Sequence, residues 1–474
     1  MRGYSFYSNL IVSILCVCHG VASHASVTIE AVYQQSCGGC HGRDLGGGQA
    51  SSLNDGDWLY VKTHDQIQAL IKEGIPDAGM PAFYAFDDNT LRGLQVYILE
   101  KAFYRDKDLQ SKVDAPIPGK VYITRSHSFK LEKIFSGSGE LWAIEVLPDG
   151  SLLVTQQNGT LWHYNAKDGR TSINNTPEVR FFSQGGLMDI IAHPNYMQNG
   201  WLYLAFSHKN ISDKGMTRIV RGKINDGKWT QQQTVFSASE KVYLTVGHHY
   251  GSRLEFVDKY LFFSIGDRGQ KNLAQDLSSP LGKIHRVHDN GKIPSDNPFV
   301  NTDNAIPSIW SYGHRNPQGL FSSKDGVLWQ TEHGPRGGDE LNIITKGANY
   351  GWPLVTYGIN YDGTAFEWQA SSNVLNDPIY YWTPSPGISN LAVYFGTEFP
   401  KWEGNLLVSS LGKEQLHLLS LRDQLVVSDE IILQNQGRIR DIFIDSSGEI
   451  FLVINPEKKG GPGAVYKMIP TKTR

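Results

Sequence analysis

Charge, cysteine and long apolar runs are all scarce in this chain of 474 residues. Charged residues make up 19% of it and the formal net charge is −3, so it lacks the positive field with which proteins bind nucleic acids or membrane surfaces. The apolar stretch from Leu10 to Val17 is too short to cross a bilayer. We therefore expect no nucleic-acid partner and no membrane span, in a chain long enough for two or three domains.

Only four cysteines are present, and two of them, Cys16 and Cys18, lie near the N-terminus. There Arg2 precedes the apolar stretch, and Ser23-His24-Ala25 follows it. A charged, then apolar, then small-residue order is typical of a cleaved signal peptide, which we expect to span residues 1–25. Cys16 and Cys18 would leave with it, and the mature protein would be periplasmic.

The other two cysteines form the run Cys37-x-x-Cys40-His41, the spacing at which a c-type haem is attached. Two thiols three residues apart can bond both vinyl groups of one porphyrin, and the following histidine binds the iron. A zinc site would need four ligands, and a thioredoxin-like dithiol lacks the expected preceding strand. Met80, in a Gly-Met-Pro loop, is the predicted sixth ligand, with His64 as the alternative.

The chain divides into two regions of different texture. Residues 27–105 carry helical periodicity and predict a small all-α cytochrome c domain, and residues 106–123 read as a linker. From residue 124 to 474 the pattern changes to short β-rich runs, several of them after Asp-Gly or Ser-Gly turns. This repetition predicts an all-β propeller, with a pair of β-sandwiches as the alternative.

Polar residues of the second region gather in Gly-rich runs beside the predicted strand ends. The runs cover residues 247–254, 265–269, 312–320, 332–335, 338–342, 349–353 and 437–441. Their arginines indicate an acidic small molecule, and a histidine with a nearby aspartate indicates an oriented general base. Carbonyls in a Gly-Pro turn beside a glutamate indicate a hard cation such as calcium. The alternative interpretation is that these arginines are buried and only pair with structural carboxylates.

Across roughly residues 130–470, these runs resemble the soluble pyrroloquinoline quinone (PQQ)-dependent aldose sugar dehydrogenases, the glucose/sorbosone dehydrogenase family. Residues 184–188, 193–196, 312–320 and 349–353 carry the resemblance. It implies a six-bladed β-propeller that oxidises an aldose at C1 by hydride transfer to PQQ.

The resemblance also implies a role for individual residues. His249 would take the proton of the sugar C1 hydroxyl, and Asp267 would hold its imidazole. Arg315 would stabilise charge on the cofactor oxygens, with Gln184 and Asn316 beside it. An imidazole near its ordinary pKa of about 6.5 can accept this proton at neutral pH.

Calcium is implied at two places. The carbonyls of Gly334 and Pro335 would hold the ion that polarises the quinone, and a fixed cation there stabilises the charge that arrives with hydride. Glu340 and Tyr350 would hold a second, structural calcium ion.

The family's arginines and lysine for the cofactor are matched only in part. Arg438 and Arg440 would bind the cofactor carboxylates. The family places a lysine directly after a Ser-Leu pair, whereas here Gly412 follows that pair and Lys413 comes one residue later. One residue reverses the side-chain direction within a strand, so we expect Lys413 to serve only if a bulge restores its aim.

The fusion itself has a chemical reason. A hydride carries two electrons and a haem accepts one at a time, so we expect the cytochrome to drain the reduced cofactor and pass electrons to a periplasmic cytochrome or quinone-linked acceptor. Three alternatives stay open: a sorbosone-like aldehyde or polyol as substrate, a haem d1 nitrite reductase, and a non-catalytic module that binds a sugar or a protein.

Overall fold

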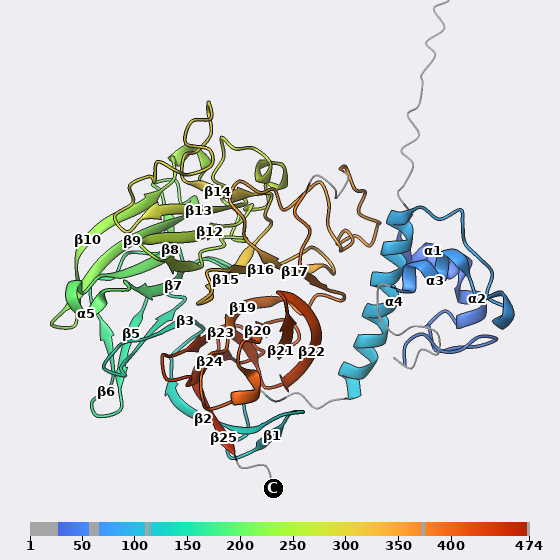
Figure 1. Ribbon diagram of the computed structural model, residues 1–474, viewed down its shortest axis with the longest axis horizontal. Coiled ribbons are helices and arrows are strands. Elements are labelled where there is room, and N and C mark those ends of the chain that lie inside the picture. The colour runs from blue at the N-terminus through green and yellow to red at the C-terminus, as the bar shows by residue number, and fades with distance from the viewer. Residues whose placement is uncertain (1–26, 56–65, 110–112, 114, 371–374, 472–474) are drawn as a thin grey trace, which may run out of the picture.

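The computed structural model describes residues 27–55, 66–109, 113, 115–370 and 375–471. The predicted signal peptide, with Cys16 and Cys18, and the alternative haem ligand His64 lie outside these residues. A small helical domain lies beside a large β-propeller (Figure 1). Among the described helices, none combines the length and the apolar character that a bilayer crossing requires.

The helical domain is built around one apolar cluster. Its helices are α1 (Ile29–Ser36), α2 (Gly38–His41), α3 (Gln66–Glu73), the 3₁₀ turn η1 (Pro76–Ala78) and α4 (Asp88–Leu109). Thr28 caps α1 by accepting the Ala31 N–H at 3.2 Å, and Asp87 accepts the Thr90 N–H at 2.7 Å where α4 begins. Since α4 continues to Leu109 and β1 begins at Val121, the predicted linker of 106–123 overlaps both elements.

The propeller contains 25 strands among the described residues, arranged in six antiparallel sheets. The first blade consists of β3 (Leu141–Val146), β4 (Leu152–Gln156), β5 (Leu161–Asn165) and β6 (Gly169–Ile173). The second consists of β7 (Leu187–Ala192), β8 (Leu202–Lys209), β9 (Gly215–Asn225) and β10 (Lys228–Ser237). The third consists of β11 (Leu254–Val257), β12 (Tyr260–Ile265), β13 (Lys283–His288) and β14 (Ile309–Tyr312).

The next two blades and the final sheet complete the ring. The fourth blade consists of β15 (Pro317–Ser322), β16 (Leu328–Glu332), β17 (Asp339–Ile343) and β18 (Tyr380–Trp382). The fifth consists of β19 (Ile388–Val393), β20 (Leu406–Ser410), β21 (Gln415–Arg422) and β22 (Leu425–Gln434). The final sheet consists of β23 (Arg438–Ile444), β24 (Ile450–Asn455), β25 (Ala464–Thr471), β2 (Ser128–Ser136) and β1 (Val121–Ile123). Short helices in the loops are α5 (Tyr196–Asn199), η2 (Glu240–Val242), η3 (Lys271–Ala274) and η5 (Pro400–Trp402). The predicted six-bladed propeller with a small helical domain is confirmed.

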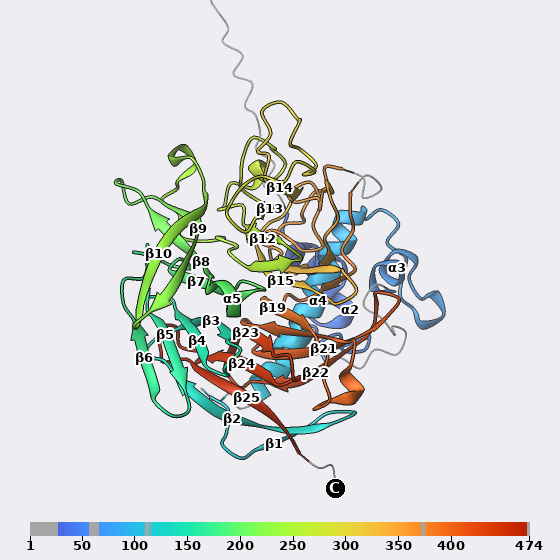
Figure 2. The ribbon, with the colours of Figure 1, turned by 60° about the vertical axis from the view of Figure 1, so that its left-hand side comes forward.

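The ring closes by joining strands from both ends of the propeller sequence. β2 pairs antiparallel with β25, with Ser128 opposite Thr471, so the last blade contains the first and the last strands (Figure 2). The first strand of each blade lies innermost, and β3, β7, β11, β15, β19 and β23 contact one another around a closed ring. Strands such as β4 and β20 are buried along their whole length, which explains their continuous apolar runs.

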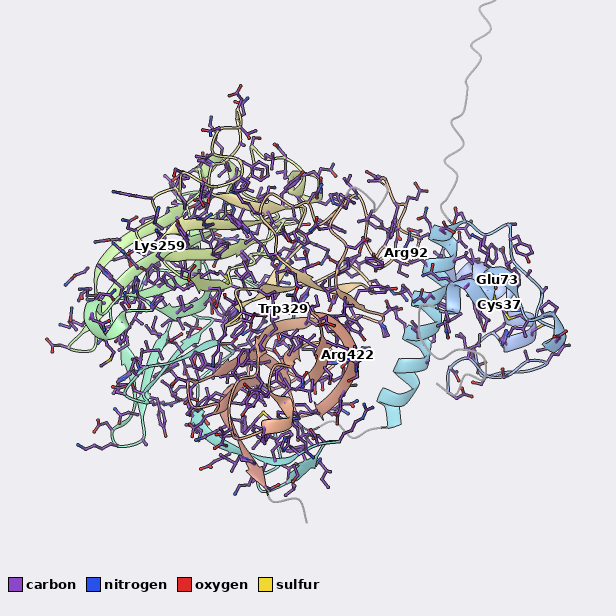
Figure 3. The ribbon with its side chains drawn as sticks, viewed as in Figure 1. Cys37, Glu73, Arg92, Lys259, Trp329 and Arg422 are labelled. Atoms are coloured by element: carbon purple, nitrogen blue, oxygen red, sulfur yellow. The ribbon has the colours of Figure 1, made fainter. Side chains whose placement is uncertain are left out.

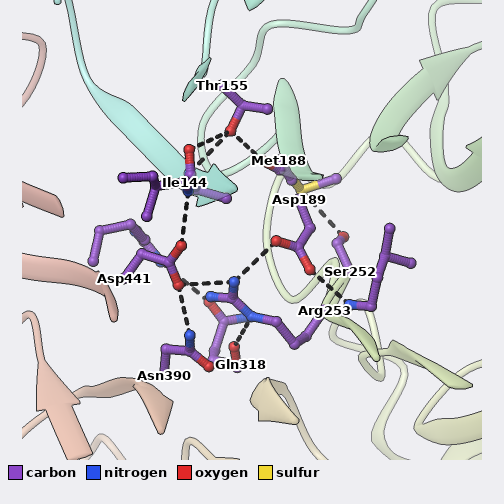
Figure 4. Close-up of polar contacts among 12 residues, drawn as sticks. Ile144, Thr155, Met188, Asp189, Ser252, Arg253, Gln318, Asn390 and Asp441 are labelled. Atoms are coloured by element: carbon purple, nitrogen blue, oxygen red, sulfur yellow. Dashed lines mark hydrogen bonds and ion pairs between the residues drawn. The ribbon is translucent and has the colours of Figure 1, made fainter. Parts of the chain in front are cut away.

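Arg253 lies near the axis of the propeller and joins several blades (Figure 4). Its guanidinium is 2.9 Å from a carboxylate oxygen of Asp189 and 2.9 Å from one of Asp441, and its Nε donates to the Gln318 carbonyl at 3.0 Å. All three charged side chains are almost fully buried, so removal of one partner would leave an uncompensated charge. Arg253 is therefore a buried arginine that pairs with structural carboxylates, which is the alternative interpretation given above for the arginines.

Candidate active site

His249 lies in the loop before β11 and is paired with Asp267, which follows β12. The His249 Nδ1 atom is 2.7 Å from Oδ1 of Asp267. Because a carboxylate only accepts, Nδ1 carries the proton and Nε2 keeps a free lone pair. The backbone N–H of His249, at a left-handed φ of 55°, donates to Oε1 of Gln184 at 2.8 Å. The loop therefore presents a neutral imidazole in one tautomer.

Hydrogen bonds fix both carboxylate oxygens of Asp267. Its side chain is 1% exposed, and its oxygens also accept the Gly269 N–H and the Trp352 indole N–H, each at 2.8 Å. Its own N–H donates to the Arg315 carbonyl at 2.7 Å. Burial alone would raise the pKa of Asp267, but the hydrogen bond from His249 and the charge of Arg315 bring it below the ordinary value. The carboxylate therefore stays ionised and fixed in orientation.

The pKa of His249 is far from the ordinary value that we expected. Burial is the largest cause and lowers it to about 4, helped by the charge of Arg315, and the hydrogen bond to Asp267 only partly opposes this shift. The expectation of an unperturbed imidazole is therefore wrong, because the loop encloses the ring in protein. The imidazole is neutral at pH 7, as a general base must be.

Arg315 and Asn316 lie between this pair and the next blade. The Arg315 guanidinium donates to the His333 carbonyl and to the Tyr361 hydroxyl, both at 3.2 Å. Its Nε is buried and has no hydrogen-bond partner among the described residues. Asn316 accepts the Gly251 N–H at 3.2 Å. The unpartnered donor of Arg315 fits a carboxylate or a quinone oxygen supplied by a bound molecule.

Arg440 offers a second unpartnered donor. One of its terminal nitrogens donates to Gln318 at 3.2 Å, while its buried Nε finds no acceptor in the described part of the chain. Enclosure by protein lowers its pKa to about 10, so it remains charged at neutral pH. Arg438 is instead paired with Glu140 at 3.0 Å. The arginines thus differ: Arg440 has spare donors for an acidic ligand, and Arg438 already has a carboxylate.

Lys413 does not lie within a strand. β20 ends at Ser410, and Lys413 follows in the turn before β21, where its Nζ donates to the Pro384 carbonyl at 3.2 Å. The expectation assumed a strand at Lys413, and the structure has none there, so the alternation of side chains along a strand does not apply to it.

The Gly334–Pro335 turn has the character of a cation site. Asp339 holds it, with one oxygen accepting the Gly334 N–H at 3.0 Å and the other accepting the N–H groups of Gly387 and Ile388 at 2.8 and 3.0 Å. Within the described residues, no hydrogen bond reaches the carbonyls of Gly334 and Pro335. Free carbonyls on a fixed turn are ligands that suit calcium.

Glu340 and Tyr350 line one small cavity together with Glu332. Burial, and then the charge of Glu332, raises the pKa of Glu340 well above its ordinary value. The Tyr350 hydroxyl is used by the backbone, accepting the Thr345 N–H at 2.8 Å and donating to the Ile343 carbonyl at 2.5 Å. Tyr350 could therefore ligate only through its carbonyl. Two neighbouring buried carboxylates fit a divalent cation, which would relieve their repulsion.

No group of three or more His, Cys, Asp or Glu side chains in the described ranges could hold a metal by itself. A cation at either place would depend on backbone carbonyls, as calcium sites commonly do.

The Cys37-x-x-Cys40-His41 run also has features that suit a haem. Cys37, directly before α2, and Cys40, within it, are free thiols, and the His41 Nδ1 is 2.9 Å from the Ser51 carbonyl. Since a carbonyl only accepts, the proton lies on Nδ1 and Nε2 is left to bind iron. Met80 packs against the same apolar cluster as Cys37. Cys37 and Met80 therefore share one apolar region, and an apolar region between an attachment cysteine and a thioether fits a haem.

Several residues of the site were not assigned from sequence. Trp352, His333 and Asp339 stand inside the Gly-rich runs but carried no role, because a hydrogen bond to one of the predicted site residues is not visible as a sequence pattern. Tyr361, which bonds Arg315, is 72% exposed in a long loop and gave no signal.

Comparison with known proteins shows the family of each domain. Residues 139–465 match the family described as Glucose / Sorbosone dehydrogenase, and residues 24–98 match the cbb3-type cytochrome c oxidase subunit III family. Aldose sugar dehydrogenase YliI of Escherichia coli (strain K12) is 39% identical over 329 residues, 67% of this chain and 88% of the relative.

Solved structures share the propeller. The soluble aldose sugar dehydrogenase of Escherichia coli in the apo-form has a TM-score of 0.68 at 34% identity, covering 72% of this chain and 100% of that chain. The PQQ-bound form of aldose sugar dehydrogenase from Streptomyces coelicolor has a TM-score of 0.60 at 26% identity, covering 75% and 100%.

Fold and site together define an oxidoreductase built on a six-bladed propeller. The chain belongs to the glucose/sorbosone dehydrogenase family and carries a cytochrome c domain at its N-terminus. The resemblance inferred from the sequence is confirmed.

Proposed function

We propose that this protein is a periplasmic quinohaemoprotein that oxidises an aldose at C1 to the lactone and passes the electrons through its own haem to an external acceptor. The observation that carries the proposal is the His249–Asp267 pair, 2.7 Å apart, beside the unpartnered donor of Arg315. A base, its orienting carboxylate and a cation next to them are what removal of a proton and a hydride from a sugar carbon requires.

His249 performs the proton transfer. Its Nε2 accepts the C1 hydroxyl proton, and the ionised Asp267 stabilises the imidazolium that results. PQQ, when bound, supplies the acceptor of the C1 hydride. The residues that would hold it are Gln184, Arg315, Asn316, Lys413, Arg438 and Arg440. A PQQ-bound relative supports this choice of cofactor.

Two calcium positions complete the proposal. The carbonyls of Gly334 and Pro335 would place one ion beside the cofactor, where a fixed charge favours arrival of hydride without reorganisation. Glu340 and the carbonyl of Tyr350 would hold the second, which offsets the repulsion between buried carboxylates.

The cytochrome domain takes the electrons onward. Cys37 and Cys40 would attach the haem, His41 would bind the iron from one side and Met80 from the other. Export of the mature protein to the periplasm, after loss of residues 1–25, fits a covalently attached haem.

One experiment tests the whole sequence of events. Purified protein with haem, PQQ and Ca²⁺ is mixed with a panel of aldoses, aldehydes and polyols while the haem spectrum is recorded. We expect aldoses to convert oxidised haem to reduced haem. Reduction by aldehydes or polyols alone would replace the aldose with another substrate of the same family. Unchanged haem during active dye-linked turnover would overturn the electron transfer.

A further inference from the structure

One chain segment, residues 352–368, contacts the catalytic pair at one end and the cytochrome domain at the other. Trp352 donates its indole N–H to Oδ2 of Asp267 at 2.8 Å. The Trp352 ring lies against that of Phe366, with 5.8 Å between the ring centroids and 32° between the ring planes. Phe366 is 7% exposed. An aromatic pair, half-buried at Trp352 and buried at Phe366, therefore leads away from the proposed site of proton transfer.

The far end of the segment lies on α4. Arg92 of α4 donates to the Phe366 carbonyl at 3.2 Å, and its guanidinium is 4.2 Å from the centroid of the Trp368 ring. Asn89 accepts the Trp368 N–H at 3.4 Å. Figure 3 shows Arg92 where α4 meets the propeller, with Cys37 on the other side of that helix. α4 thus stands between the segment and the haem-attachment run.

Other contacts fix the two domains to each other. Arg336 of the propeller pairs with Glu100 of α4 at 2.7 Å, and the Glu100 side chain is 8% exposed. The Ile29 N–H donates to the Gly363 carbonyl at 2.8 Å. Ala365 packs into the apolar cluster that also contacts Cys37 and Met80. The segment is therefore part of the wall of both domains.

We propose that residues 352–368 form the bridge by which electrons leave the sugar-oxidising site for the haem domain, with the Trp352–Phe366 pair as its first half and α4 as its second. This inference rests on the proposed function. Electron tunnelling weakens steeply across gaps, and here packed rings and hydrogen bonds run without a break from Asp267 to α4. The Glu100–Arg336 pair would hold the bridge in place.

The electrons balance as follows for one sugar. The aldose gives a proton to His249 and a hydride to the bound cofactor, and becomes the lactone. The two electrons of that hydride cross the bridge singly, and both its proton and the proton held by His249 pass to solvent. After each crossing, an external one-electron acceptor such as ferricyanide re-oxidises the haem.

The first test replaces Phe366 with leucine, which keeps an apolar side chain and removes the ring. In rapid mixing of the complete holoprotein with a saturating aldose, we expect haem reduction in Phe366→Leu to slow severalfold. Dye-linked turnover, which bypasses the haem, and the melting temperature should stay close to wild type. Phe395→Leu, a matched change at a ring that lies away from the bridge in blade five, should leave haem reduction unchanged.

The second test removes the ion pair between Glu100 and Arg336. In protein without PQQ, we expect Glu100→Gln and Arg336→Gln to raise amide hydrogen exchange in residues 352–368, and the double variant to add little to either single change. In holoprotein, the same variants should slow haem reduction without slowing dye-linked turnover.

The outcomes separate this inference from the proposed function. If wild-type haem is not reduced by any sugar while dye-linked turnover proceeds, the proposed electron transfer is wrong. If wild-type haem is reduced and Phe366→Leu reduces it at the same rate, the bridge is wrong. An equal fall in haem reduction and dye-linked turnover would also overturn the bridge, because the segment would then act only as a wall of the sugar site.

Discussion

The indole nitrogen of Trp352 lies 2.8 Å from Oδ2 of Asp267, the carboxylate oxygen that His249 does not use. Trp352 and Asp267 are 85 residues apart in sequence and lie in loops of different blades, between β17 and β18 and between β12 and β13. The carboxylate that orients His249, the proposed base, is thus itself held by a tryptophan from the neighbouring blade.

Replacement of Trp352 by phenylalanine tests this relationship. The variant keeps the ring and loses one hydrogen bond to a carboxylate, so we expect kcat to fall roughly fivefold, the equivalent of about 1 kcal/mol, with KM nearly unchanged. Steady-state dye-linked kinetics measures both. Trp368→Phe is the matched control, since its indole donates to the Thr356 carbonyl and not to Asp267. Equal losses in the two variants would contradict the specific role of Trp352.

Loss of the base should abolish most of the activity. We expect His249→Ala and Asp267→Asn to lower kcat by about 10²–10⁴-fold, the usual contribution of a positioned base. PQQ affinity, measured by titration of the apoprotein, should change little. His248→Ala is the control, because the neighbouring ring does not bond Asp267. Undiminished turnover in His249→Ala would favour a binding module over an enzyme.

The lowered pKa of His249 predicts an unusual pH dependence. The base becomes protonated only near pH 4, so the acid limb of kcat/KM should lie near that value and well below about 6.5. The unfolded chain takes up this proton first as pH falls from about 6.5 to about 4, so His249 lowers stability over that window and has no such effect above it. A pH–rate profile, with urea unfolding of His249→Gln as reference, measures both. An acid limb near 6.5 would contradict the effect of burial.

Calcium should stabilise the fold through Glu340. The ion relieves repulsion between Glu340 and Glu332, so we expect Ca²⁺ to raise the melting temperature of the wild type and EGTA to lower it. Glu340→Gln should melt higher than wild type in EGTA and gain less from Ca²⁺. Glu132→Gln, an exposed change in β2, should behave as wild type. An unaltered calcium response in Glu340→Gln would remove Glu340 from the site.

Met80 is the predicted sixth ligand of the haem iron. Its thioether raises the reduction potential of a haem, so Met80→Ala should lower the midpoint potential and change the absorption spectrum of the oxidised haem. His64→Ala is the comparison, and it should leave both unchanged. A spectroelectrochemical titration of the two variants distinguishes the ligands. If His64→Ala produces the changes, the ligand is His64.

Several features of this protein can be predicted from short stretches of its sequence. The Cys37-x-x-Cys40-His41 spacing, the helical periodicity before residue 105 and the short apolar runs, such as that at residues 260–265, can be read directly because each depends on neighbours in sequence. The Gly-rich runs lie at strand ends as expected; for example, residues 247–254 lead into β11 and residues 265–269 follow β12.

Other properties came only from contacts between distant residues. The blade closure joins Ser128 to Thr471, and the domain junction joins Arg92 to Phe366, 274 residues away. The shift of the His249 pKa and the turn position of Lys413 likewise have no local signature. The sequence alone determined which chemical groups are present and in which local elements, because motif spacing and periodicity are short-range. Only the tertiary structure decided their burial, their partners and the contacts between the two domains, because these depend on which remote surfaces pack together.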